Sequence, residues 1–174
     1  MKKLLICCLV GFALLFGINW IQDSTAPKQT QVFSLSDYAY SELEERMIYK
    51  ADNMTVVDRF AQQTRTANGK VTGKTDYYLV TYRDKNDRLV AAILSVDDDD
   101  GIYFSLSLYA NDEKQNIGDR VLNGYMKTRS NTNAKLTQYF NEAIDKYGPV
   151  LNEYLVSPQW MLEYRCGPDS DPLK

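Results

Sequence analysis

The first feature of the chain is an uninterrupted apolar run at residues 4–21, which follows Met1 and two lysines. The run carries no charge, and only Asn19 and Trp20 bring polar side-chain atoms to it. At about 1.5 Å per residue, a helix of this length spans roughly 27 Å, close to the hydrocarbon thickness of a bilayer. We therefore expect a transmembrane anchor, with residues 1–3 in the cytoplasm because paired lysines stay on that side.

A cleaved signal peptide is the alternative, since it also combines basic residues with an apolar run. The best small-residue triplet for cleavage ends at Ala26, but Pro27 follows it directly and resists cleavage. Residues 22–31 are polar and are predicted to form a tether. Whether the chain is anchored or secreted, we expect the remaining domain, residues 32–174, to lie outside the cytoplasm.

Helical spacing of apolar residues predicts a first helix within residues 33–52. Tyr40, Leu43 and Met47 recur on one face of this segment. Serines precede them as candidate caps, and Asp37 would stand in the first turn, where the helix dipole favours a negative charge. The segment is therefore expected to be amphipathic and to cover one face of a sheet.

A second helix is predicted over residues 132–148. Thr132 or Asn133 can cap its start, while Gly148 and Pro149 are typical of a helix end. Its apolar side chains follow the i, i+3, i+4, i+7, i+8, i+11 pattern of a helix with one buried face: Leu136, Tyr139, Phe140, Ala143, Ile144 and Tyr147.

Between these two segments the apolar period changes to two, which indicates strands. Asn68-Gly69 predicts a hairpin turn, residues 83–88 and Asp100-Gly101 predict two more turns, and Gly124 suggests a bulge or a close approach. The tail is expected to add an edge strand that Pro158 interrupts. The predicted strands occupy residues 54–66, 75–83, 89–96, 102–110, 119–128 and 153–164.

The predicted fold class is α+β. An N-terminal transmembrane helix precedes an antiparallel sheet of about five strands, and two amphipathic helices cover this sheet. Tyr78, Val80 and Tyr82 are expected on one face of their strand, opposite Tyr77 and Leu79.

The chain has no histidine, which excludes most common catalytic sites. Ser-His-Asp and Cys-His hydrolases need an imidazole, and zinc needs more nitrogen or sulfur ligands than one exported cysteine provides. A pair of carboxylates stays open, as does a Ser–Lys dyad, although no SxxK motif occurs. We expect a non-enzyme that needs no cofactor, and the alternative is an anchored carboxylate-dependent hydrolase acting on envelope glycan.

Two motifs suggest ligands but are better explained by turns. Gly73–Thr75 ends like a nucleotide-binding P-loop, yet the residues after it have strand period, whereas a P-loop needs a helix there. We therefore expect a glycine-containing turn and no nucleotide. Asp97–Asp100 could hold a weak Ca²⁺ ion, but an EF-hand loop does not fit, and a solvated hairpin turn is the default prediction.

Charge and cysteine content narrow the partners further. Setting aside Lys2, Lys3 and Asp23 leaves 18 basic and 22 acidic residues in the exported part. An acidic domain offers no footprint for nucleic acid. Cys166 is the one cysteine beyond the apolar run, so no internal disulfide forms there, which favours a bacterial envelope protein. Cys166 itself is either a small buried side chain or a handle for pairing with another chain.

The sequence is rich in tyrosine, with 13 in all. Tyr103 and Tyr109 are predicted to point away from the apolar side of their strand, where they could stack on sugar rings or contact a protein. The alternative is that the tyrosines pack under the first helix or support the second face of the sheet. We expect a membrane-tethered interaction domain whose partner is an envelope protein or wall glycan; recognition by the anchor itself, as in an accessory subunit, is a third possibility.

Overall fold

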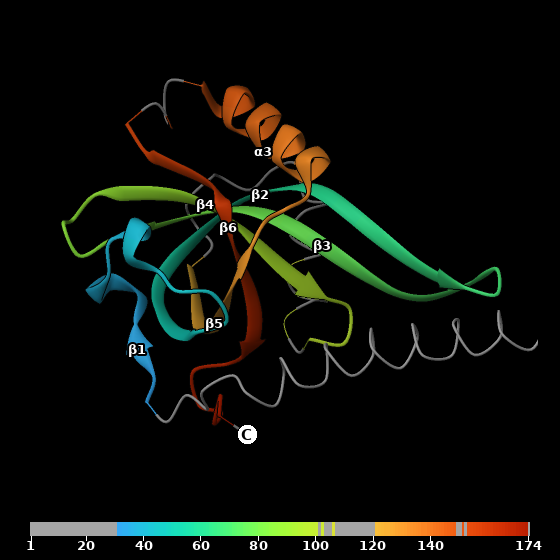
Figure 1. Ribbon diagram of the computed structural model, residues 1–174, viewed down its shortest axis with the longest axis horizontal. Coiled ribbons are helices and arrows are strands. Elements are labelled where there is room, and N and C mark those ends of the chain that lie inside the picture. Colours follow the sequence, from blue (N-terminus) through green and yellow to red (C-terminus); the bar gives the residue numbers. More distant parts are fainter. Residues whose placement is uncertain are drawn as a thin grey trace, which may run out of the picture. The chain divides into compact units, whose positions relative to one another are not determined.

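The computed structural model describes residues 31–100, 102, 106, 121–148, 151 and 153–173. The chain divides after Thr30, and Gln31–Lys174 form one unit, whose described residues are shown in colour in Figure 1. No helix in those described ranges is long and apolar enough to cross a membrane. The predicted cytoplasmic segment, the anchor and the tether up to Thr30 lie outside them.

The described unit is α+β, with a mixed six-stranded sheet and one helix. Two short 3-10 helices lie near its start. In chain order the elements are β1 (Phe33–Ser34), η1 (Leu35–Asp37), η2 (Tyr40–Glu42), β2 (Ile48–Ala67), β3 (Lys70–Arg83), β4 (Leu89–Asp97), β5 (Val121–Ser130), α3 (Ala134–Tyr147) and β6 (Leu155–Cys166).

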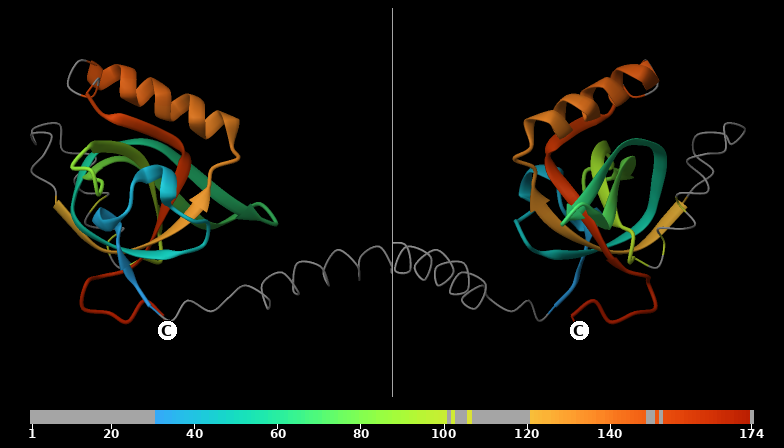
Figure 2. Two further views of the ribbon diagram at one scale, coloured as in Figure 1. Left: turned by 60° about the vertical axis from the view of Figure 1, so that its left-hand side comes forward. Right: turned by 90° about the vertical axis from the view of Figure 1, so that its right-hand side faces the viewer.

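Five of the strands close into a ring, visible in the turned views of Figure 2. β2, β3 and β4 pair antiparallel in succession, and β5 returns to pair with the other side of β2. This is the strand order of a Greek key. β6 then lies between β4 and β5, parallel to the first and antiparallel to the second, and it closes the ring. The predicted purely antiparallel sheet is therefore wrong.

The length of β2 allows this closure. Its first part pairs with β5 and its second part with β3, so one strand bends to serve two partners. The bend follows a bulge at Asp52 and Asn53, where Asn53 is left-handed with a φ of 58°. The Asn53 N–H donates to the Asn123 side chain at 2.7 Å, which ties the bulge to β5. Bulges bend and twist strands in this way.

The predicted helix within residues 33–52 is wrong, because this segment forms β1, η1, η2 and the start of β2. Left-handed Arg46, with a φ of 66°, is incompatible with a continuing helix. β5 takes the backbone groups instead: the Thr128 carbonyl accepts from Arg46, and the Thr128 N–H donates to Met47, both at 2.8 Å. Side chains at four-residue spacing are nevertheless buried and imitate a helix: Leu35, Ala39 and Leu43.

Most of the predicted strands are confirmed. β2, β3, β4 and β5 cover the segments expected for them, and Asn68 and Gly69 form the hairpin turn with φ angles of 52° and 74°. Asp84–Arg88 and Asp97–Asp100 form turns. Gly124 is a close approach, because a Cβ there would lie 2.8 Å from the Cys166 carbonyl of β6.

Two strand predictions need correction. At Leu106, inside the predicted strand 102–110, the backbone is helical and its N–H donates to the Ile102 carbonyl at 3.0 Å. The tail does form a strand, but β6 has neighbours on both sides and is no edge. Pro158 is accommodated because the pairing with β4 jumps from Ser157 to Met161, and a bulge tolerates the missing N–H.

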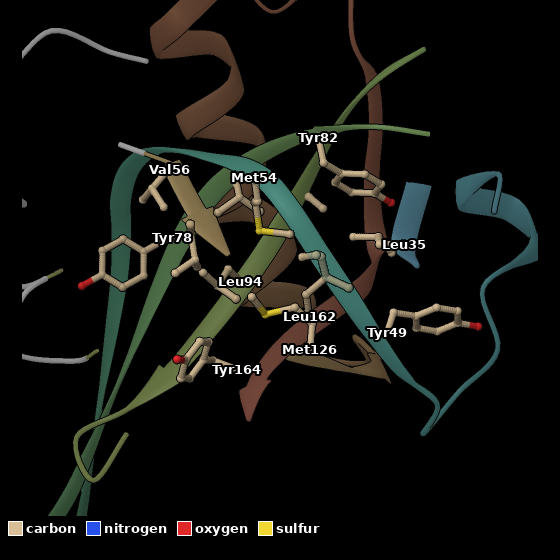
Figure 3. Close-up of a cluster of buried hydrophobic side chains, with 14 of the residues drawn as sticks. Leu35, Tyr49, Met54, Val56, Tyr78, Tyr82, Leu94, Met126, Leu162 and Tyr164 are labelled. Carbon is tan, nitrogen blue, oxygen red and sulfur yellow. The ribbon is translucent and has the colours of Figure 1, made fainter. Parts of the chain in front are cut away.

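The interior of the ring holds the larger apolar cluster (Figure 3). Alternate residues of β3 and β4 point into it, as the period of two predicts for Tyr78, Val80 and Tyr82. The N-terminal segment adds Leu35 and Leu43 to the same cluster. The largest side chains with almost no exposure include Met54, Leu94, Met126 and Leu162.

The outer face of β3 and β4 is covered by α3, so the prediction of this helix is confirmed. The Asn133 side chain caps it by accepting from two backbone N–H groups, and the helix ends at Gly148 with a φ of 45°. Phe140 is fully buried and meets Phe60 of β2 edge to face, with ring centroids 5.8 Å apart. At the far end, Lys146 binds Asp58 of β2 at 2.7 Å.

Candidate functional site

An open groove of about 380 Å³ lies between the first turns of α3 and the neighbouring part of the β2–β3 hairpin. We call it the α3 groove. It combines two tyrosine rings with amide, hydroxyl and ammonium groups, and none of the described residues that line it is acidic. These residues are Ala61, Gln62, Gln63, Thr64, Tyr77, Asn133, Lys135, Leu136 and Tyr139.

The strand side of the groove is set by the alternation of β3. Tyr78 points into the ring, so Tyr77 points outward, where it packs at the edge of the cluster beneath α3. The Tyr77 hydroxyl donates to the Gln63 side-chain carbonyl at 2.8 Å. Burial raises the pKa of Tyr77, so this phenol is a neutral donor at physiological pH.

The helix side of the groove is set by the periodicity of α3. Leu136 is buried beneath the helix and fixes its rotation, which leaves Tyr139 as an exposed aromatic side chain with 37% of its surface accessible. Lys135 lies one turn before Tyr139, and its ammonium is 5.6 Å from the centre of the tyrosine ring. The groove is thus bounded by an aromatic ring with a cation beside it.

A buried carboxylate holds the floor of the groove in place. Asp76 is fully buried, and its side chain accepts from Gln62 at 2.7 Å, from Arg59 at 3.2 Å and from the Tyr78 hydroxyl at 3.3 Å. Because Gln62 lines the groove, this network connects the groove to the interior of the ring. A buried charge is stable only with such partners.

A second open groove, of about 490 Å³, lies where β2, β3 and β4 meet the segment before β6. Its one acidic lining residue, Asp52, pairs with Lys50 at 3.2 Å. Arg83 also lines it and pairs with Asp87 at 3.0 Å. The charges in this second groove are therefore already engaged by neighbours.

The predicted binding residues Tyr103 and Tyr109 lie outside the described residues. Two of the other tyrosines considered, Tyr78 and Tyr82, are buried in the ring. The sequence reasoning missed Tyr139, because its spacing places it on the buried face of the helix. Lys135 four residues earlier was the available signal, since this spacing brings two side chains together on a helix.

The two motifs that suggested ligands have structural explanations. Gly73–Thr75 lies inside β3, so the expected turn at this position is wrong. Gly73 lets the Arg65 guanidinium cross the strand, because a Cβ there would lie 2.8 Å from it. Arg65 pairs with Asp97 and Asp98 at 3.4 and 3.8 Å. Within the described ranges, no three Asp, Glu or Cys side chains are grouped to hold a metal ion.

Cys166 is half-buried at the end of β6 and forms no disulfide. Burial raises the pKa of its thiol, so the reactive thiolate is disfavoured. This environment does not prepare the residue for nucleophilic chemistry.

Comparison with known proteins gave no match to a family model, to a curated protein or to a solved structure.

Proposed function

We propose that this chain is a membrane-tethered, non-catalytic domain of the bacterial cell envelope that binds wall glycan through the α3 groove. The observation that carries the proposal is the exposed Tyr139 ring beside a row of amide and hydroxyl groups. A tyrosine ring can stack on the apolar face of a sugar, while amides bond its hydroxyl groups. The tether and the location outside the cytoplasm rest on the apolar run at residues 4–21.

The chemistry of the lining supports binding over hydrolysis. Glycoside hydrolysis uses two carboxyl groups about 5–10 Å apart across the scissile bond. The described lining of the α3 groove has no acidic residue, and that of the second groove has only Asp52. The groove's volume of about 380 Å³ lies within the range of small-ligand sites, which is enough for a few sugar units.

The proposal is tested by titrating the full chain, in detergent micelles, with soluble fragments of purified cell-wall glycan. We expect Tyr139→Ala to weaken binding by about tenfold, because an aromatic contact contributes up to about 1.5 kcal/mol. Tyr125→Ala is the matched control, since Tyr125 lies on β5 and lines neither groove. No binding by the native chain, or an equal loss in both variants, would contradict the proposal.

The cellular location needs a separate measurement. In intact cells, an added protease should digest the domain while residues 1–3 stay protected, and the chain should fractionate with membranes. Protection of the domain from external protease, with labelling by cytosolic reagents, would contradict the proposed location.

A further inference from the structure

In the amide side chains of the α3 groove, the oxygens are bonded within the protein but some NH₂ groups are not. The inference drawn from this difference rests on the proposed function. The side-chain oxygen of Asn133, Oδ1, is engaged, because it accepts from the backbone N–H groups of Lys135 and Leu136, both at 3.1 Å. The side-chain oxygen of Gln63, Oε1, is engaged too, because it accepts from the Tyr77 hydroxyl. Both side chains keep an NH₂ group that makes no bond within the described part of the chain.

The cation of the groove is in the same situation. Lys135 contacts the Tyr139 ring, and no acidic side chain in the described ranges forms an ion pair with it. An ammonium has three donors and no acceptor, so it too offers only donors. The end of the groove near the start of α3 therefore carries a positive charge and amide donors that no acceptor among the described residues engages.

Gln62 is engaged on the opposite face of the hairpin. It lies across from Asp76 in the β2–β3 register, and its NH₂ group donates to the buried Asp76 carboxylate at 2.7 Å. The amide and ammonium donors on the groove side therefore come from Gln63, Asn133 and Lys135.

We infer that the α3 groove selects a glycan whose sugar units bear carboxylates, with the carboxylate bound by Lys135 and Asn133 and the sugar ring on Tyr139. A carboxylate only accepts hydrogen bonds, so it matches the donors of Lys135 and Asn133 better than a hydroxyl does. Its bonds to a cation are about twice as strong as neutral ones. A phosphate on a flexible chain without sugar rings would satisfy the donors but would leave Tyr139 uncovered.

The test compares two ligands that differ in one group: a hexuronic-acid oligosaccharide, and the same oligosaccharide with its carboxyls reduced to alcohols. Binding to the full chain in detergent micelles is measured by calorimetry at low and high salt. We expect the acidic ligand to bind at least about tenfold more tightly at low salt, and this preference to shrink as salt screens the charge.

Two variants locate the preference. Lys135→Gln should abolish the preference for the acidic ligand, so that the two oligosaccharides bind equally. Asn133→Asp should lower the affinity for the acidic oligosaccharide below that of the native chain. It should not unfold α3, because aspartate caps a helix as well as asparagine does. Lys127→Gln, on β5 and outside both grooves, removes the same charge and should have little effect on either ligand.

The outcomes separate the two proposals. Equal affinities for the two oligosaccharides, or tighter binding of poly(glycerol phosphate), would overturn the carboxylate inference and leave a glycan-binding groove. A preference that persists in Lys135→Gln would place the carboxylate elsewhere and overturn it as well. Failure of both oligosaccharides and of wall fragments to bind would remove the proposed function itself.

Discussion

The two faces of β3 and β4 are both buried, but different parts of the chain cover them. The inward face packs against the other strands of the ring, which closes around Leu94 and its neighbours. The outward face packs beneath a single helix, chiefly through Leu79, Ile93 and Phe140. The strands that enclose the inward face are joined to one another by backbone hydrogen bonds. The helix α3 is held on the outward face by side-chain packing and by the Lys146–Asp58 ion pair.

This difference separates stability from the proposed function. The apolar side chains inside the ring are buried and contribute packing. The α3 groove lies on the outer face, where the first turns of the helix meet the hairpin, and its ligand groups come from both. The position of α3 on the hairpin therefore decides whether Lys135, Tyr139 and Gln63 stand together.

The largest expected effects come from truncating one large buried side chain inside the ring and one beneath α3. Leu94→Ala should lower the free energy of unfolding by about 2–5 kcal/mol, and Phe140→Ala by about 3–5 kcal/mol, because both side chains are fully buried. Denaturant unfolding measures both. At a temperature where both variants are folded, Leu94→Ala should keep native glycan affinity and Phe140→Ala should lose it. The reverse result would show that the groove does not depend on the helix.

The next effect concerns the network that joins the two sides. Asp76→Asn removes the charge that engages Arg59 and Gln62, at an expected cost of about 1.5–3 kcal/mol in the free energy of unfolding. Asp87→Asn is the control, since its ion pair with Arg83 is exposed and its loss should cost less than about 1 kcal/mol. Equal stability losses would show that the Asp76 network contributes no more than a surface pair.

A smaller effect is expected where β5 and β6 complete the ring. Gly124→Ala places a Cβ 2.8 Å from the Cys166 carbonyl, a backbone atom that cannot move alone. We expect a loss of about 1–3 kcal/mol in thermal unfolding. Glycan affinity should not change, since neither residue lines the α3 groove. Val121→Ala, at an exposed position of the same strand, is the control; if the two variants melt alike, the close approach is not tight.

The smallest effect is a pH dependence at the turn after β4. Burial raises the pKa of Asp100 to about 6 from 3.8, and the charges of Asp97 and Asp99 add to the shift. The folded state keeps a proton that the unfolded chain releases, so this group's contribution to stability falls as pH rises through that window. Asp100→Asn should have the same melting temperature as the native protein near pH 4. Above pH 6 its melting temperature should be slightly higher than that of the native protein. A constant difference across this range would contradict the assignment.

Local patterns of the sequence account for the two faces but not for the ring. Alternation placed Tyr78 and Leu79 on opposite sides of β3, and the capping and end signals of α3 were correct. The closure depends on the bulge at Asn53 and on the insertion of β6 between β4 and β5. These are contacts between distant segments, which local periodicity does not encode.

The candidate site was missed for a related reason. Tyr139 has the spacing of a core residue, and only the rotation of α3, fixed by Leu136 and Phe140, leaves its ring exposed. The donors of Asn133 and Gln63 become available only because their carbonyls are engaged by particular neighbours. Such pairings depend on the assembled fold, so composition and motifs could predict a tyrosine-based surface but not its location.

The most direct test of the account is to map the bound glycan on the folded chain by NMR, following backbone amide shifts of the full chain in micelles during titration. The account predicts that shifts concentrate at residues 62–64 and 133–139, on the two sides of the α3 groove. Shifts confined to the second groove, at residues 52–55 and 81–83, would contradict it.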